Sequence, residues 1–172
     1  MQQKADIFMQ LTLDGETLEL ETLWKAARTA LDPSARLSIA IAEPAKARIR
    51  EAEGFLKDLI SSGKTIYGLN TGFGFFARQR IEPEAIEQLQ HNIIVSHACG
   101  VGEELPRDLV MAMWLILINS ICRGKRGLAL EKTERILQTL QQGMLAAVPA
   151  RGSVGASGDL APTAHAVLAL LG

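Results

Sequence analysis

The sequence predicts a mainly α-helical fold with a small β-hairpin near the N-terminus. Apolar residues recur three or four positions apart through most of the chain, which is the spacing of one face of a helix. Alternation of the kind found in strands is confined to the first twenty residues. With 172 residues, 48% of them hydrophobic and 22% charged, the chain has a globular composition and the length of one domain or part of one.

The predicted hairpin comes first. Every second residue from Ile7 to Leu13 is apolar, and Asp14-Gly15 follows. Asp-Gly is a frequent two-residue hairpin loop, because both positions tolerate positive φ. Such a loop would place Leu11 opposite Leu18 and Met9 opposite Leu20, all on one face.

Helices are predicted after the hairpin, several of them beginning at proline and ending near glycine, as helices commonly do. The stretches with helical periodicity are Pro44–Ile60, Pro83 to Gly100, Pro106–Cys122, residues 131–142 and the apolar run Ala164–Leu171. Pro106–Cys122 is apolar nearly all round, which is typical of a central buried helix.

Charge and hydropathy exclude two classes of partner. The chain has 18 basic and 19 acidic residues, so no excess of positive charge is available to neutralise a nucleic acid backbone. The longest apolar run, Leu109–Ile118, is far shorter than the roughly 20 residues that a membrane-spanning helix needs. We therefore predict no nucleic acid and no membrane partner.

The cysteines and the N-terminus indicate a cytoplasmic protein. Residues 1–6 lack the charged and then apolar order of a secretory signal. Cys99 and Cys122 both lie in apolar helical patterns, and we expect two reduced thiols in the core. No CxxC, HExxH or similar cluster is present, so no metal site is predicted.

Two glycine-rich loops interrupt the helical pattern. Tyr67–Gly74 has three glycines in eight residues, and Gly152–Gly158 has three in seven. Glycine costs chain entropy, so such loops between well-formed helices are candidates for function. From spacing alone the second loop has several interpretations: a phosphate cradle, a serine nucleophile at Ser157, or, most simply, a helix cap by Ser157 with Asp159 favouring the helix dipole.

The segment Gly152–Pro162 resembles the signature of the histidine and aromatic amino acid ammonia-lyases. In that family an Ala-Ser-Gly triplet, here Ala156-Ser157-Gly158, cyclises with loss of water to a 4-methylideneimidazol-5-one. The resemblance implies that this group is the electrophile, with no metal or external cofactor. The N-terminus of the helix near Asp159 would offer N–H groups to negative charge on the ring.

The first loop resembles the other signature of the same family, in which the tyrosine, here Tyr67, is the catalytic base. A phenol is normally protonated at neutral pH and needs nearby positive charge or hydrogen bonds to act as a base. Nothing local in the sequence supplies these, so we expect them from elsewhere in the assembly, which the resemblance implies is a homotetramer.

His97 is the candidate for substrate choice. The segment Asn92–Gly102 resembles the part of the family that lines the side-chain pocket, and histidine-specific members have Ser-His where this chain has Ser96-His97. An imidazole can hydrogen-bond the imidazole of a substrate. The resemblance thus implies conversion of L-histidine to urocanate and ammonia, with a phenylalanine or tyrosine ammonia-lyase or aminomutase as the alternative. His165 is expected to be a structural helix residue.

The chain departs from the family in two respects. Members are much longer, so we expect residues 1–172 to be the N-terminal part of an ammonia-lyase domain, a truncated piece of a larger all-α lyase fold that is inactive alone. Members usually have serine at the position of Arg126 and arginine at that of Ala129. These differences leave open a second class of function, an inactive remnant that is only a folded helical module.

Overall fold

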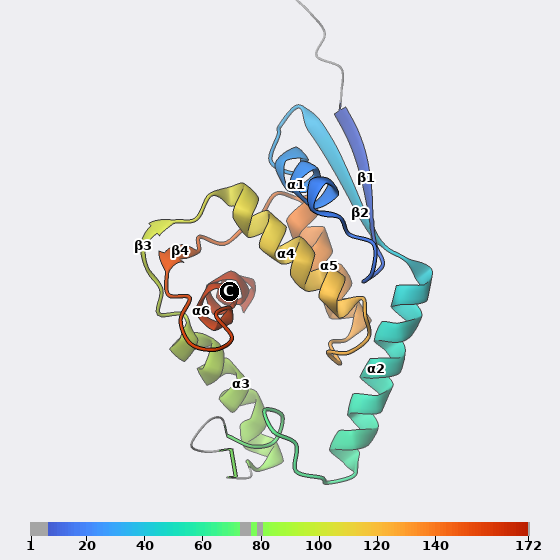
Figure 1. Cartoon of the computed structure of the whole chain (residues 1–172). Coiled ribbons are helices and arrows are strands. Elements are labelled where there is room, and N and C mark those ends of the chain that lie inside the picture. The colour runs from blue at the N-terminus through green and yellow to red at the C-terminus, as the bar shows by residue number, and fades with distance from the viewer. Residues whose placement is uncertain (1–6, 73–76, 79–80, 172) are drawn as a thin grey trace, which may run out of the picture. The chain divides into compact units, whose positions relative to one another are not determined.

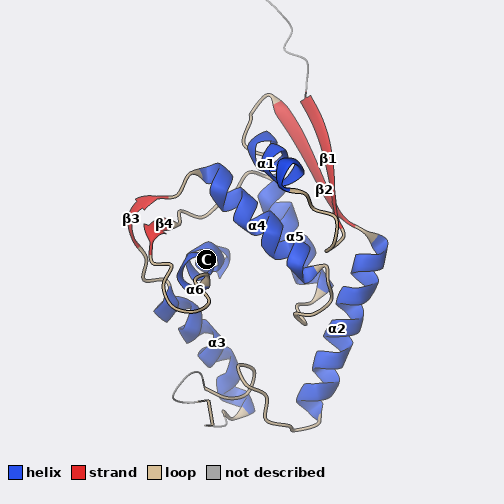
Figure 2. Ribbon diagram, viewed as in Figure 1, coloured by secondary structure: helices blue, strands red, loops and turns tan. Residues whose placement is uncertain are grey.

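The computed structural model describes residues 7–72, 77–78 and 81–171, and these residues are mainly helical, as predicted (Figures 1 and 2). The helices are α1 (Leu20–Thr29), α2 (Glu43–Ser61), α3 (Pro83–His97), α4 (Arg107–Ile121), α5 (Leu130–Gln141) and α6 (Leu160–Leu171). The strands are β1 (Ile7–Leu13), β2 (Ala35–Ile41), β3 (Val101–Glu104) and β4 (Pro149–Arg151). Three of the five predicted helices lie within one residue of their expected bounds, whereas α3 ends three residues before Gly100 and α6 begins four residues earlier than expected.

The chain divides into two compact units. Unit 1 comprises Met1–Asp58 and Pro106–Leu145, and unit 2 comprises Leu59–Leu105 and Ala146–Gly172. Each unit is therefore assembled from two separate stretches of sequence. Both glycine-rich loops and the Ser96-His97 pair belong to unit 2.

The small sheet of unit 1 corrects the predicted hairpin. β1 pairs with β2 in parallel, with Leu11 opposite Ile39, and helix α1 connects the two strands. Leu11 is buried, as predicted, but Leu20 is 80% exposed at the first turn of α1. The alternation of apolar residues in β1 identified a strand with one buried face, but it could not identify β2 as the strand that pairs with it.

The turn after β1 is held by the side chain of Asp14. The Asp14 carboxylate accepts hydrogen bonds from the backbone N–H groups of Glu16 and Thr17, at 2.8 Å each, and from the Thr17 hydroxyl at 2.6 Å. These bonds, led by that from the Thr17 hydroxyl, lower the pKa of Asp14 to about 2. Gly15 has φ +87° and donates its N–H to the Asn119 side chain of α4. Asp14 and Gly15 thus form a turn that is stabilised by the Asp14 side chain and hydrogen-bonded to α4.

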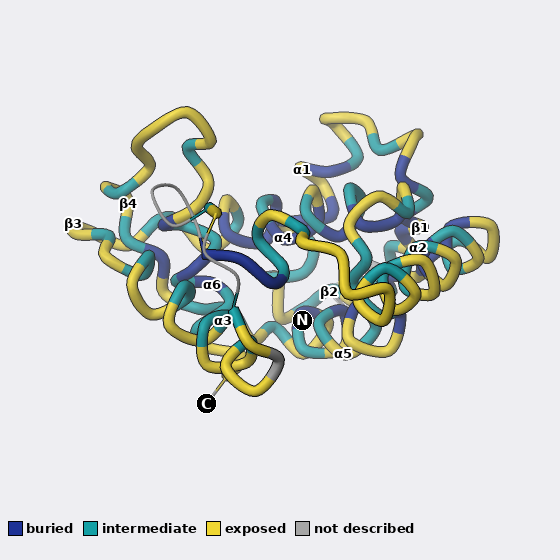
Figure 3. Tube along the Cα trace, turned by 90° about the horizontal axis from the view of Figure 1, so that it is seen from below, coloured by how far each residue is buried: buried dark blue, intermediate teal, exposed yellow. Residues whose placement is uncertain are grey.

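Helix α4 forms the core of unit 1, as predicted for a central helix, although it is not buried all round. Five of its side chains are at most 2% exposed: Val110, Met111, Trp114, Leu115 and Ile118. Small residues of α1, Ala26 and Ala27, allow that helix to pack closely on α4. Ile116 of the same helix is 53% exposed, so the described residues do not bury α4 all round. Figure 3 colours the described trace by burial.

The two cysteines have different environments, and the prediction for one of them is wrong. Cys122 is fully buried at the end of α4, and burial raises the pKa of its thiol to about 11. Cys99 is exposed, because it follows the last residue of α3 in the turn toward β3. Both are free thiols.

Unit 2 is built on the packing of α3 against α6 and on the antiparallel pair β3–β4 (Figure 1). Val101 pairs with Arg151, and Glu104 pairs with Pro149, with an irregularity between them. The ladder continues in a hydrogen bond from the Leu105 N–H to the Val148 carbonyl. The buried residues of α6 are all small, Ala161, Ala164 and Ala166, and this permits a close approach of neighbouring segments.

Candidate active site

The Tyr67 loop is organised around two buried polar residues. Asn70 is 9% exposed and Thr71 is 1% exposed. The Asn70 side chain accepts the Ile66 N–H at 2.7 Å and donates to the Lys64 carbonyl at 2.8 Å. The Asn70 carbonyl accepts the Ile81 N–H, which links the loop to the segment just before α3. Phe73 and Gly74, the end of this predicted signature, lie outside the described residues.

Tyr67 itself projects from this loop and is 64% exposed. Gly68, which follows it, has φ +77°, a conformation that favours glycine. The Gly68 carbonyl accepts a hydrogen bond from the Gln90 side chain of α3 at 3.3 Å. The loop is therefore fastened to α3 directly beside the predicted base.

The Ala156-Ser157-Gly158 segment lies between β4 and α6. Gly155 and Gly158 have φ +81° and +74°, so a positive-φ glycine stands just before the triplet and another at its end. Ala156 and Ser157 are exposed, and the Ser157 hydroxyl has no hydrogen-bond partner in the described part of the chain. The Ser153 hydroxyl instead donates to the Gly158 carbonyl at 2.5 Å.

The helix-cap interpretation of Ser157 is not supported. Helix α6 begins at Leu160, and its first turn is closed by the Thr163 N–H donating to the Asp159 carbonyl at 3.0 Å. Ser157 lies outside this turn and leaves its hydroxyl available. Gly155 has open space where a side chain would stand, so the segment turns without being enclosed by the described residues.

His97 is the last residue of α3 and is half-buried. Its Nδ1 lies 2.8 Å from the Ile93 carbonyl oxygen. A carbonyl can only accept, so Nδ1 carries the proton, and Nε2 of the neutral ring is an acceptor. Nε2 has no partner among the described residues and is free to accept a hydrogen bond from a ligand.

The structure brings the segment that follows His97 against the segment that precedes Ala156-Ser157-Gly158, at Gly100 and Gly152. A Cβ placed on Gly152 would lie 2.9 Å from the Gly100 Cα, so the two backbones touch. On the other side, the Gly100 N–H donates to His165 of α6 at 2.9 Å. The supporting roles of Asn70, Gln90 and Gly100 had no periodic signal in the sequence. The sequence signal for the two loops was their high glycine content, which is costly in chain entropy and therefore unusual between helices.

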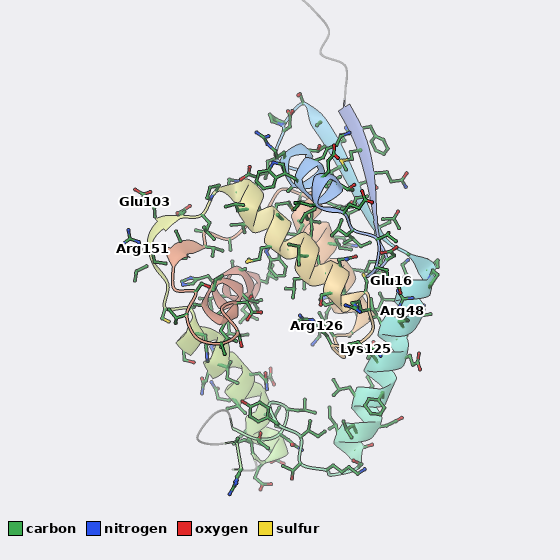
Figure 4. The ribbon with its side chains drawn as sticks, in the orientation of Figure 1. Glu16, Arg48, Glu103, Lys125, Arg126 and Arg151 are labelled. Carbon is green, nitrogen blue, oxygen red and sulfur yellow. The ribbon has the colours of Figure 1, made fainter. Side chains whose placement is uncertain are left out.

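A pocket in unit 1 marks the segment in which the sequence departs from the family. It has a volume of about 490 Å³ and lies between α2 and the turn after α4. Its basic lining residues include Arg48, Lys125 and Arg126 (Figure 4). Arg48 donates to the carbonyls of Asp14 and Cys122, and Arg126 donates to the Ser120 hydroxyl at 3.1 Å. The arginine at 126 thus has a local structural partner in this chain.

The described residues also bear on metal binding and on membrane insertion. No group of three His, Cys, Asp or Glu side chains there has the arrangement to hold a metal ion. None of the helices described combines the length and the apolar character needed to cross a membrane.

Comparisons of the sequence with known proteins agree on one family. A profile described as aromatic amino acid lyase matches residues 18–172. The chain is 37% identical over 163 residues to a histidine ammonia-lyase of Caldanaerobacter subterraneus, covering 95% of this chain and 31% of that protein. It is 40% identical over 162 residues to that of Streptococcus gordonii, covering 94% and 30%. The chain thus spans about 30% of the length of these curated relatives.

Solved structures with the same all-α lyase fold also resemble it. Ergothionase of Treponema denticola superposes with a TM-score of 0.85 at 28% identity, covering 95% of this chain and 32% of that one. Histidine ammonia-lyase of Trypanosoma cruzi superposes with a TM-score of 0.79 at 32% identity, covering 95% and 30%. Because the profile matches nine-tenths of the chain, the chain belongs to the aromatic amino acid lyase family.

Proposed function

We propose that the protein to which this chain belongs is an ammonia-lyase that converts L-histidine to urocanate and ammonia. The observation that carries the proposal is the exposed Ala156-Ser157-Gly158 turn with positive-φ glycines at 155 and 158, in a member of the aromatic amino acid lyase family. Its relatives at 37–40% identity are histidine ammonia-lyases, which favours histidine as the substrate.

The residues present fit an electrophile made from the backbone of the triplet. Closing a ring between the Gly158 nitrogen and the Ala156 carbonyl carbon requires a sharp bend, and the positive φ of Gly155 and Gly158 bends the chain there. Ser157 must lose its hydroxyl as water, and this hydroxyl is held by no other described residue. Once formed, a 4-methylideneimidazol-5-one would supply the electron-poor carbon to which the amine of the substrate adds.

Two side chains of unit 2 would handle the substrate. The acceptor at His97 Nε2 suits an N–H donor on the imidazole of histidine, and its geometry is fixed by the Nδ1 bond to Ile93. Tyr67 would remove the β-proton, and its loop is anchored by Gln90 and by the buried Asn70. We further propose that the complete enzyme is a cytoplasmic homotetramer, in which other segments supply the groups that activate Tyr67.

Intact mass and turnover test the proposal in the whole protein. Wild type should be lighter than its sequence by two water molecules and should release urocanate from L-histidine, which is followed by ultraviolet absorbance. Ser157→Ala has no hydroxyl to eliminate, so it should lose at most the one water of ring closure and should have no turnover. Ser153→Ala, which removes a hydroxyl from the same loop, should still lose two waters.

The results would separate the alternatives. An active preparation with an unmodified mass would refute the electrophile. A protein that loses both waters but prefers phenylalanine or tyrosine would be an aromatic ammonia-lyase or aminomutase. A protein without dehydration or turnover on any of the three amino acids would be the inactive helical module.

A further inference from the structure

The loop that holds Ala156-Ser157-Gly158 is fastened at both ends to one backbone position. Before the triplet, Gly152 lies against Gly100, so close that a Cβ on Gly152 would be 2.9 Å from the Gly100 Cα. After the triplet, α6 carries His165, whose Nε2 accepts the Gly100 N–H at 2.9 Å. Gly100 follows His97 by three residues, so it joins the end of α3 to both flanks of the triplet.

The hydrogen bond fixes the state of the His165 ring. A backbone N–H can only donate, so Nε2 must be unprotonated, and the neutral ring carries its proton on Nδ1. A protonated ring would have two donors and could not accept from Gly100. The bond therefore requires one tautomer of a neutral imidazole.

The surroundings of Gly100 leave little freedom for a replacement contact. A Cβ on Gly100 would lie 3.1 Å from His165 Nε2, 3.1 Å from the Pro149 Cβ and 3.2 Å from the Arg151 carbonyl oxygen. Two segments, β4 and α6, thus meet at a residue without a side chain. Of the residues around Gly100, His165 contacts it through a side-chain hydrogen bond, which is directional.

We propose that His165 is a positioning residue, which through its Nδ1–H tautomer and the Gly100 N–H sets the place of His97 relative to Ala156-Ser157-Gly158. The effect on catalysis rests on the proposed function, whereas the hydrogen bond between His165 and Gly100 does not. Without this bond, the segment after His97 loses its hydrogen bond to α6, the helix that follows the triplet, while the residues that form the electrophile remain unchanged. This goes beyond our expectation from sequence that His165 is an ordinary structural residue of the helix.

The first test concerns the bond and needs no substrate. In the ¹⁵N-histidine-labelled chain at neutral pH, His165 should show an unprotonated Nε2 and a protonated Nδ1, and the Gly100 amide should exchange slowly. His165→Leu should speed exchange at Gly100 and in residues 92–98 and 153–159, whereas His165→Gln, whose Oε1 can accept in place of Nε2, should keep exchange slow. A protonated Nε2 at neutral pH, or equal exchange in both variants, would overturn the proposal.

The second test concerns catalysis in the whole protein. His165→Leu should lower kcat/KM for histidine by roughly 10- to 100-fold, the scale expected when reacting groups are displaced by about 1 Å. Its mass should still show the loss of two waters. His165→Gln should recover most of the activity, and an equal loss in both variants would mean that His165 only fills space. If wild type acts on no amino acid, the proposed function fails, and the exchange data alone decide whether His165 holds the two segments together.

Discussion

Replacing Gly152 by alanine should destabilise unit 2 strongly, because two separate costs coincide at this position. Its φ of +154° lies in a region used almost only by glycine, and a Cβ there would be 2.9 Å from the Gly100 Cα and 3.4 Å from the Ala161 Cβ. The first neighbour is backbone, so it cannot rotate away as a side chain would. Accommodation requires the chain before the triplet to separate from the end of α3.

The expected loss can be worked out from these two costs. Holding a non-glycine residue in such a conformation costs about 1–3 kcal/mol. Forcing an extra methyl group into a packed contact costs about another 1–3 kcal/mol. The free energy of unfolding should therefore fall by about 2–6 kcal/mol, measured by urea denaturation followed by circular dichroism, with hydrogen exchange in α6 to localise the effect.

Gly155→Ala in the same loop is the matched control. Gly155 has φ +81° but open space around the new Cβ, so only the conformational cost of about 1–2 kcal/mol applies. The steric contact between Gly152 and Gly100 is the difference between the two variants. If Gly152→Ala were no more destabilising than Gly155→Ala, the backbone junction at Gly100 would not exist as described.

Three further predictions concern single side chains. Tyr67→Phe should lower turnover of histidine by about 10²–10⁴ while the two waters are still lost, and near-normal turnover would remove Tyr67 as the base. His97→Leu should weaken histidine binding by about 1–3 kcal/mol, seen as a raised KM, and an unchanged KM would refute the substrate assignment. The pKa of Asp14 is depressed from 3.8 to about 2, so its stabilising effect is complete above the ordinary value and is lost as the pH falls from 3.8 through 2. Asp14→Asn should lower stability near neutral pH and flatten acid unfolding in that window, and an unchanged acid profile would contradict this.

The sequence predicted those parts of the fold that depend on nearby residues. Helices α2 to α5 were found because periodicity, an initial proline and a terminal glycine act within a few residues. The pairing of β1 with β2 was missed because alternation has the same form in parallel and antiparallel strands. The Asp14-Gly15 turn was mistaken for a hairpin loop, because the Asn119 side chain that receives the Gly15 N–H lies 104 positions later.

The candidate site likewise has some residues that could be predicted from the sequence and others that could not. The two glycine-rich loops and the Ser96-His97 pair could be found in the sequence, since their composition is unusual and they resemble known signatures. The residues that support them could not. Asn70 acts through hydrogen bonds inside its own loop, and Gly100 acts through contacts with residues about 50 and 65 positions away. Single asparagines and glycines give no periodic signal by which to predict such contacts.

The three glycines of the second loop have two different purposes, and this difference bears on the chemistry. Gly152 is needed for packing, because only a residue without a side chain fits against Gly100. Gly155 and Gly158 have no such crowding and serve to bend the chain before and at the end of the triplet. The loop is thus fixed at its start and bent at its centre. Ring closure between the Ala156 carbonyl carbon and the Gly158 nitrogen needs both properties, because a bend in a freely moving chain would hold these atoms together for only a small fraction of the time.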